Sequence, residues 1–228
     1  MKGHFSILLM MIMAMLLMAC GSVTSQQTAT TSGGNSVGAD PAVLGAKKKA
    51  QKVDYGRILF VGDSRTVDMF SADEWEFRNL QRDGVTVYCR HACDFSFLVE
   101  AVDEYGVDNF DTLVSWMGCN DKGDFSNYGP YYDQLIAQGK KVVVCTVGPT
   151  QDEYLNEGNG DNINYVDANQ VKYNDALKTW AKGQGVKVID LYTFISKSKT
   201  ITISTEDGIH YFPQPTTELW SYVLSSLK

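Results

Sequence analysis

The stretch that decides the fold reads Arg57-Ile-Leu-Phe-Val-Gly-Asp-Ser-Arg-Thr66. Its apolar part, 57–61, predicts a strand, and Gly62 and Asp63 mark the turn that ends it. Further apolar runs follow at 85–89, 112–116, 141–147 and 186–190. Continuous runs rich in β-branched residues are typical of strands that are buried on both faces of a parallel sheet.

Helical patterns alternate with these runs, at 64–70, 95–105, 127–138, 168–182 and 216–227. Glycines at 139, 183 and 185 mark expected helix ends. The alternation predicts an α/β fold, a three-layer α/β/α sandwich around a mostly parallel five-stranded sheet. In such sheets ligands bind beyond the carboxyl ends of the strands.

The first residues have the pattern of an export signal. A short positive start precedes an apolar run from Phe5 to Ala19, which is shorter than the ~20 residues that a membrane-spanning helix needs. The run ends in Leu17-Met-Ala-Cys-Gly21, which resembles a bacterial lipobox; a plain secretory signal with a chance cysteine is the alternative. The resemblance implies a signal peptide over 1–19, lipidation of Cys20, and export to the outer face of the cell membrane, where acyl chains anchor the protein.

Residues 20–52 are expected to form a lipid-anchored flexible linker. Ser, Thr, Gly, Gln and Ala dominate this stretch, which has no hydrophobic periodicity. The remainder, 53–228, has the length of one domain.

The charge balance excludes some partners. The chain carries 20 Lys+Arg against 27 Asp+Glu, for a net charge of −7, so nucleic-acid binding is not expected. It has no Walker or Gly-x-Gly-x-x-Gly motif, and the acidic segment 156–162 lacks EF-hand spacing. No metal and no organic cofactor is expected, and the oligomeric state is left open.

The cysteines allow disulfides. Of the five, Cys20 is assigned to lipid, and Cys89, Cys93, Cys119 and Cys145 remain. An exported protein meets oxidising conditions. A Cys93–Cys119 bridge is preferred because both residues follow predicted strands; free buried thiols are the alternative.

Polar residues with catalytic chemistry come after strands or ahead of the last helix: Ser64, Asn120, Asp207 and His210. A serine hydroxyl becomes a nucleophile when a base takes its proton, and His210 can act as that base if Asp207 orients it. The Ser64 N–H at a helix N-terminus and the Asn120 amide can stabilise a developing oxyanion. Each residue alone also fits a cap, a turn or a surface histidine, but the combination favours a site.

Three blocks together resemble the SGNH/GDSL hydrolase family, in the family's order over about 57–228: Phe60-Val-Gly-Asp-Ser-Arg65, Gly118-Cys-Asn-Asp121 and Asp207-Gly-Ile-His210. The resemblance implies the flavodoxin-like SGNH hydrolase fold over 53–228. It also implies that Ser64, Asp207 and His210 form the catalytic triad, and that Ser64 N–H and Asn120 donate to the oxyanion.

The chain departs from the family in its second block, where a glycine N–H is the third oxyanion donor. The segment after the second predicted strand, 90–97, has no glycine. Asp94 is expected to supply this backbone N–H, with Ala92 as the alternative. Arg65 and Gly118 are expected to contact substrate; pairing of Arg65 with an acid such as Asp94 is the alternative. His91 lines the site or is an ordinary loop histidine.

The sequence therefore predicts a cell-surface serine esterase that hydrolyses small acyl esters, above all acetyl esters, on carbohydrate. Its expected partners are an acylated carbohydrate or other small ester and, through the lipid, a membrane. Two alternatives stay open: an O-acyltransferase with the same triad, and a non-catalytic surface glycan-binding protein on a hydrolase scaffold.

Overall fold

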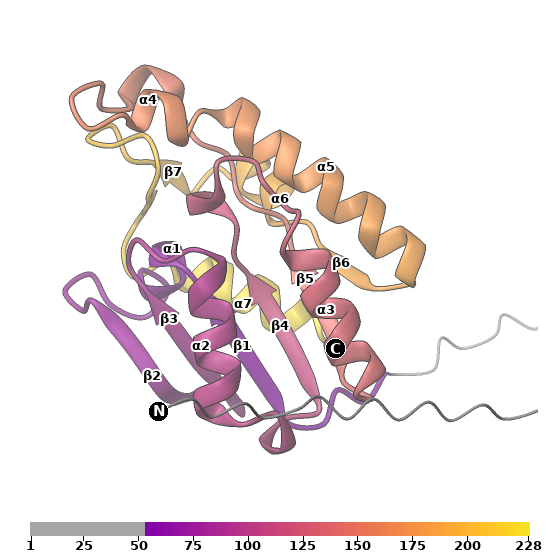
Figure 1. Cartoon of the computed structure of the whole chain (residues 1–228). Helices are drawn as coiled ribbons and strands as arrows, with labels where there is room; N and C mark the ends of the chain where they lie inside the picture. Colours follow the sequence, from indigo (N-terminus) through magenta and orange to yellow (C-terminus); the bar gives the residue numbers. More distant parts are fainter. Residues whose placement is uncertain (1–52) are drawn as a thin grey trace, which may run out of the picture. The chain divides into compact units, whose positions relative to one another are not determined.

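The computed structural model describes residues 53–228, which are built around a six-stranded sheet (Figure 1). The strand order is β2-β3-β1-β4-β5-β6, and every neighbouring pair is parallel except β2 with β3. The strands are β1 (Ile58–Gly62), β2 (Glu76–Arg82), β3 (Val85–Arg90), β4 (Thr112–Trp116), β5 (Lys141–Cys145) and β6 (Lys187–Ile189). The β1 strand is central, because Ile58 pairs with Val85 of β3 on one side and with Thr112 of β4 on the other.

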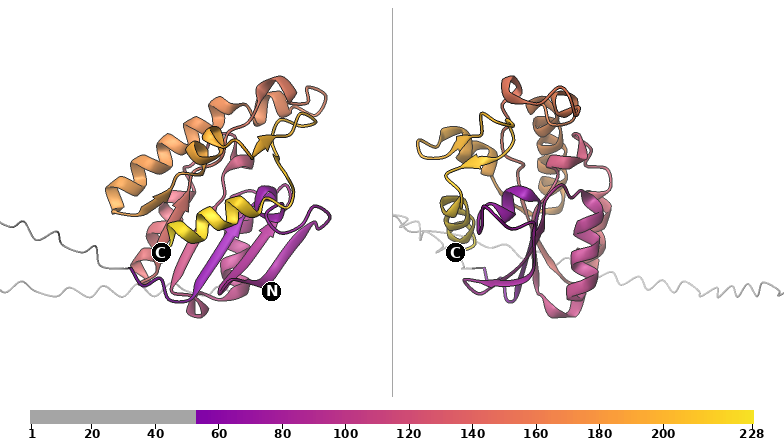
Figure 2. Two further views of the ribbon diagram at one scale, coloured as in Figure 1. Left: turned by 180° about the vertical axis from the view of Figure 1, so that it is seen from behind. Right: turned by 90° about the vertical axis from the view of Figure 1, so that its left-hand side faces the viewer.

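Helices cover both faces of the sheet (Figure 2). One face packs against α2 (Phe95–Tyr105), α3 (Tyr128–Ala137) and α5 (Asp167–Gln184). The other face packs against α1 (Ser64–Val67), α6 (Leu191–Lys197) and α7 (Thr217–Ser226). A short helix α4 (Asp161–Asn164) and a two-stranded antiparallel ribbon of β7 (Thr202–Ile203) and β8 (Tyr211–Phe212) complete the described elements beside three short 3₁₀ turns.

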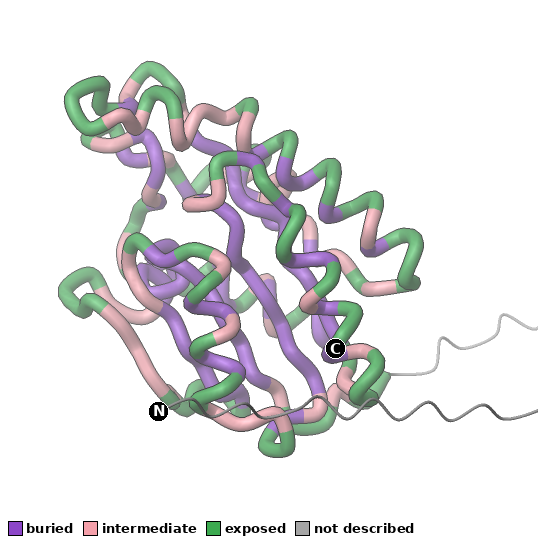
Figure 3. Tube along the Cα trace, in the orientation of Figure 1, coloured by how far each residue is buried: buried purple, intermediate pink, exposed green. Residues whose placement is uncertain are grey.

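The two cores follow from the alternation of side chains along each strand. In β1, Leu59 and Val61 belong to the core under α2, α3 and α5, and Phe60 belongs to the core under α1, α6 and α7. All three are fully buried, and buried strands run through the middle of Figure 3. The continuous apolar run is needed because both faces of this strand are covered.

The three-layer α/β/α architecture is confirmed, with one strand more than the five expected. The extra strand, β2, is antiparallel at the sheet edge, and all of its residues are half-buried or exposed. Its sequence, Glu-Phe-Arg-Asn-Leu-Gln-Arg, has too few apolar residues to resemble the central strands. A bulge between Phe77 and Leu80, where Asn79 has a φ of 55°, also interrupts its alternation.

Helix boundaries differ in detail from the expectation. The helix expected over 64–70 is regular only over α1, and α6 was not expected at all. Gly183 lies inside α5, which ends at Gly185, where a φ of 68° suits a helix C-cap.

The preferred Cys93–Cys119 bridge is wrong. Cys89, Cys93, Cys119 and Cys145 are free, buried thiols. The Cys93 Sγ donates to the Gly62 carbonyl at 3.8 Å. Burial raises the pKa of Cys119 to about 12, which suppresses the thiolate that disulfide exchange requires.

The predicted signal peptide (1–19), the lipidated Cys20 and the linker (20–52) lie outside the described residues. Within 53–228, no helix combines the length and apolar character needed to cross a membrane.

Candidate active site

The turn from β1 into α1 presents Ser64 at the carboxyl edge of the sheet. Gly62 permits the turn, because a Cβ at this position would lie 1.9 Å from Thr66 Oγ1. Asp63 is the N-cap of α1, and its side chain accepts a hydrogen bond from the backbone N–H of Arg65. Ser64 is the first residue of α1, so its N–H has no acceptor within the helix.

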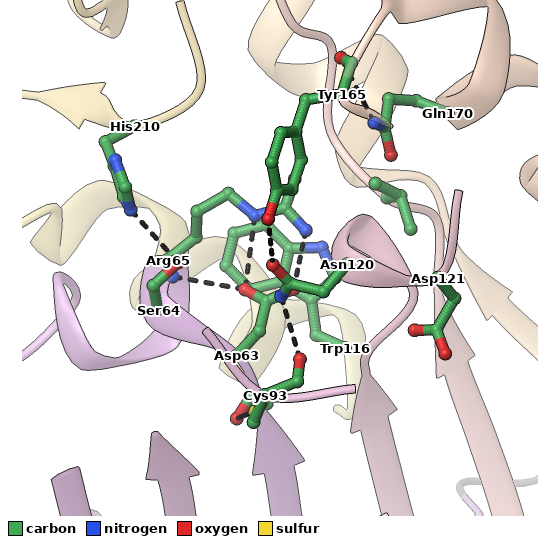
Figure 4. Close-up of polar contacts among 12 residues, drawn as sticks. Asp63, Ser64, Arg65, Cys93, Trp116, Asn120, Asp121, Tyr165, Gln170 and His210 are labelled. Atoms are coloured by element: carbon green, nitrogen blue, oxygen red, sulfur yellow. Dashed lines mark hydrogen bonds and ion pairs between the residues drawn. The ribbon is translucent and has the colours of Figure 1, made fainter. Parts of the chain in front are cut away.

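Arg65 does not face the cleft, which corrects its predicted role in substrate contact. Its side chain is fully buried and forms a two-pronged ion pair with Asp63, with Nη2–Oδ2 at 2.7 Å and Nε–Oδ1 at 3.2 Å. The guanidinium also lies over the Trp116 ring, 5.2 Å from its centroid. The side chains of the two residues that flank Ser64 are therefore bonded to each other (Figure 4).

The predicted serine, histidine and aspartate come together in one hydrogen-bonded series. His210 Nε2 lies 3.0 Å from Ser64 Oγ, across a sequence separation of 146 residues. His210 Nδ1 lies 2.7 Å from Asp207 Oδ2. Asp207 Oδ1 accepts from the backbone N–H groups of Ile209 and His210 at 2.8 and 3.1 Å. One carboxylate oxygen thus shapes the loop while the other holds the imidazole, whose Nε2 is left to accept the Ser64 proton.

The charges around His210 favour its protonated form. Burial lowers the pKa of His210, but the hydrogen bond with Asp207 and the charges of Asp68 and Asp207 outweigh burial and raise it above its usual 6.5. Asp68 is a buried carboxylate whose Oδ2 has no hydrogen-bond partner within the described residues. Burial raises the pKa of Asp68 to about 6, against the opposing effect of His210. A base with a raised pKa is a stronger proton acceptor once it is neutral.

Asn120 lies across the cleft from His210, in a 3₁₀ turn (Cys119–Asp121) after β4. Its Nδ2 donates to the Cys93 carbonyl at 2.8 Å, and its Oδ1 accepts from the Tyr165 hydroxyl at 3.0 Å. Nδ2 carries two hydrogens, so one N–H is left over after the bond to Cys93.

The segment after β3 leads into α2 and borders the cleft. Asp94 caps α2, where its carboxylate accepts from Ser96 N at 2.9 Å and Ser96 Oγ at 2.6 Å. The residues of this segment that line the cleft are His91 and Ala92, whose φ is 51°. Donation to the oxyanion by the Asp94 backbone N–H, or by that of Ala92, stays a prediction. The peptide that contacts Asn120 is that of Cys93.

Gly118 has a packing role rather than a place on the cleft wall. A Cβ there would lie 2.3 Å from the Tyr173 ring, and the φ of Gly118 is 117°. Gly118 is also buried and is not among the residues that line the cleft, so the structure gives no support to its predicted contact with substrate.

A cleft of about 220 Å³ joins these groups. Its lining residues are Ser64, Trp75, His91, Ala92, Asn120, Asp161, Tyr165, Asp207, Ile209 and His210. Trp75 is 64% exposed and stacks on His91, with ring centroids 5.1 Å apart and an interplanar angle of 21°. Sequence reasoning missed Trp75 and Tyr165, because neither belongs to a motif or directly follows a strand.

Metal ligation has no evident site in the described part of the chain. No group of three or more His, Cys, Asp or Glu side chains within 53–228 is arranged to hold an ion.

No protein-family model and no curated protein sequence matches the chain. Solved structures match it in fold. A lipase/acylhydrolase from Enterococcus faecalis gives a TM-score of 0.55 at 16% identity, over 75% of this chain and 95% of its own. A GDSL-like lipase from Bacteroides thetaiotaomicron gives 0.55 at 15% identity, over 78% and 91%.

A catalytic mutant of an acetylxylan esterase from Geobacillus stearothermophilus gives a TM-score of 0.51 at 14% identity, over 78% of this chain and 96% of its own. The likeness extends over nearly the whole length of these proteins, and it is one of fold. The chain therefore has the fold of the SGNH/GDSL hydrolases.

Proposed function

We propose that the chain is a serine esterase whose nucleophile is Ser64. Ser64 Oγ attacks the ester carbonyl carbon while its proton passes to His210 Nε2, and Asp207 stabilises the imidazolium. The tetrahedral intermediate collapses, and the alcohol leaves with the proton from His210. Water then gives a proton to His210 and attacks the acyl-enzyme, which releases a carboxylic acid and restores Ser64.

Two donors are available for the oxyanion. The Ser64 N–H has no helical acceptor, and the second N–H of Asn120 Nδ2 is left over after its bond to Cys93. Donors that are already oriented toward the developing charge need no reorganisation during the reaction.

The observation that carries this proposal is the uninterrupted contact series from Ser64 Oγ through His210 to Asp207, at 3.0 and 2.7 Å. A histidine bound to a carboxylate on one side and to a hydroxyl on the other is the arrangement that activates a serine. The fold of known acylhydrolases supports the same reaction class.

The cleft favours a short acyl group on an uncharged alcohol. Its volume of about 220 Å³ is below the range of about 300–1,000 Å³ for sites that enclose drug-sized ligands. The charged residues on its wall are Asp161 and Asp207, beside His91 and His210. Carboxylates without a Lys or Arg on this wall disfavour an anionic substrate. We therefore propose small acyl, above all acetyl, esters as substrates.

Trp75 supports a carbohydrate as the alcohol. An exposed indole at the cleft offers a flat apolar face, and the axial C–H groups of a neutral sugar ring can stack on it. The acetylxylan esterase fold neighbour is consistent with this class. Trp75→Ala should raise KM for an acetylated oligosaccharide about 5- to 30-fold, corresponding to about 1–2 kcal/mol, and should affect ethyl acetate, which has no ring, much less. Val171→Ala, at an exposed apolar position of α5, is the control; equal effects on both esters would exclude ring stacking.

The location of the enzyme is a proposal of its own. A lipidated Cys20 at the end of the apolar segment 5–19 would hold the domain at the outer face of the cell membrane. Metabolic labelling with a palmitate analogue tests this, with Cys20→Ala as the control.

A fluorophosphonate probe tests the nucleophile. We expect a covalent adduct on the Ser64 peptide, no adduct in Ser64→Ala, and full labelling in Ser221→Ala, an exposed serine of α7. Folded protein without an adduct would overturn the esterase proposal and favour a glycan-binding protein. Transfer of the acyl group to an added sugar at the expense of hydrolysis would favour an acyltransferase.

A further inference from the structure

The Asn120 amide is held between two segments that are distant in sequence. Cys93 precedes α2, and Tyr165 follows α4, 45 residues after Asn120. The amide donates to the first and accepts from the second (Figure 4). Both of its polar atoms are thus engaged, and one N–H is left over.

The two contacts have different physical effects. Since the Cys93 carbonyl only accepts, Nδ2 rather than Oδ1 must face it, which fixes which way round the amide lies. The Tyr165 hydroxyl then holds Oδ1 and so restrains rotation of the amide plane. A hydrogen bond donated to Oδ1 also polarises the amide, which makes its N–H groups better donors.

Tyr165 is itself firmly placed. Its carbonyl accepts from Thr150 Oγ1 at 2.7 Å and from Gln170 Nε2 at 3.3 Å. Gln170 is fully buried in α5, and the Thr150 N–H donates to Asp167 at 3.1 Å. The Tyr165 ring is half-buried on the cleft wall. The hydroxyl therefore reaches Asn120 from a fixed backbone.

We propose that Tyr165 is a positioning residue for oxyanion stabilisation, whose hydroxyl holds the Asn120 amide so that its remaining N–H points at the oxyanion. The inference rests on the proposed esterase function. It predicts that the Tyr165 hydroxyl contributes to the rate only through Asn120.

A double-mutant cycle on the full chain tests this. Tyr165→Phe removes the hydroxyl and keeps the ring, and it should lower kcat for an aryl acetate about 3- to 10-fold, the range expected for one hydrogen bond, with KM within twofold. Asn120→Ala should cost about 100- to 1,000-fold, as for loss of an oxyanion donor. In the Asn120→Ala background, Tyr165→Phe should have no further effect on single-turnover acylation.

The control is Tyr222→Phe, because the Tyr222 ring stacks on Phe194 in another pocket and phenylalanine keeps the stack. Three results would overturn the inference: wild-type kcat in Tyr165→Phe, a change in KM alone, or a loss that persists in the Asn120→Ala background. The last two would instead indicate direct contact of Tyr165 with substrate. Failure of the esterase proposal is distinguishable, since Ser64→Ala would then turn over like the wild type.

Discussion

Removal of the Arg65 side chain should destabilise the protein rather than weaken substrate binding. Arg65 and Asp63 have fully buried side chains, joined at 2.7 and 3.2 Å. Arg65→Ala leaves the Asp63 carboxylate buried without its counter-charge, although the bond from the Arg65 N–H remains. It also removes the guanidinium that lies over Trp116.

The expected cost is about 3–5 kcal/mol, the range for breaking a buried pair by removing one partner. With an m-value of about 2 kcal/mol/M, the urea midpoint should fall by about 1.5–2.5 M. The total stability of a domain is only about 5–15 kcal/mol, so the variant should be close to the limit of folding. Arg65→Lys keeps the charge but loses the planar guanidinium, so its urea midpoint should lie between those of the wild type and Arg65→Ala.

The chain offers a matched control in Arg57→Ala. Arg57 forms the same kind of two-pronged pair with Asp111, but both side chains are exposed, at 58% and 44%. Water screens such a pair, so the urea midpoint should barely change. Urea unfolding of both variants, followed by tryptophan fluorescence, together with their KM values, distinguishes a structural role of Arg65 from contact with substrate. A midpoint within about 0.5 M of the wild type, together with a tenfold rise in KM, would refute a structural role for Arg65 and restore its predicted contact with substrate.

Two further predictions concern the cleft and its supports. Asp68→Asn should lower the pKa of His210, because the Asp68 charge favours the imidazolium. Since the reaction requires neutral His210, the acid limb of the kcat/KM profile should move to lower pH. An acid limb that stays in place or moves to higher pH would contradict this. Gly118→Ala should cost at least about 2 kcal/mol, from overpacking and backbone strain, because its Cβ would lie 2.3 Å from Tyr173. Gly139→Ala, with a φ of 82° and no atom within 4 Å of the added Cβ, measures strain without the clash; equal urea midpoints for the two variants would exclude overpacking at Gly118.

The central strands could be predicted because burial on both faces leaves a local signature. Three valines in succession, 142–144, are all buried in β5, and no water-facing side of the strand requires a polar residue. The edge strand β2 has no such signature. Arg78 of β2 pairs with Glu76 of the same strand and with Glu100 and Glu104 of α2. The strand is therefore stabilised partly by ion pairs, which leave no apolar pattern in the sequence.

The contact between Asp207 and His210 was predictable because both residues belong to one short block of sequence. Asp207 and His210 are three residues apart, and the loop that joins them is closed because the Asp207 carboxylate accepts hydrogen bonds from the backbone N–H groups of Ile209 and His210. Pairing of Arg65 with an acid was one of two expectations, but Asp63 as that acid was not predictable, because side chains two residues apart ordinarily do not face each other on a helix. Asp63 lies just outside α1 with extended backbone angles, a φ of −89° and a ψ of −160°, and its carboxylate accepts hydrogen bonds from the Arg65 side chain.

The contacts of Asn120 mark the limit of what a single sequence allows. Its block after a strand predicts that it is an oxyanion donor, but which way the amide lies depends on Cys93 and Tyr165, 27 and 45 residues away. Neither contact uses an unusual residue type: one is a peptide carbonyl, which any residue provides, and the other is one of 12 tyrosines. The ability of an asparagine amide to donate is thus local to its motif, whereas the orientation of this amide depends on loops that only the folded domain brings together. For this reason a substitution at Tyr165 should reduce catalysis although no motif contains it.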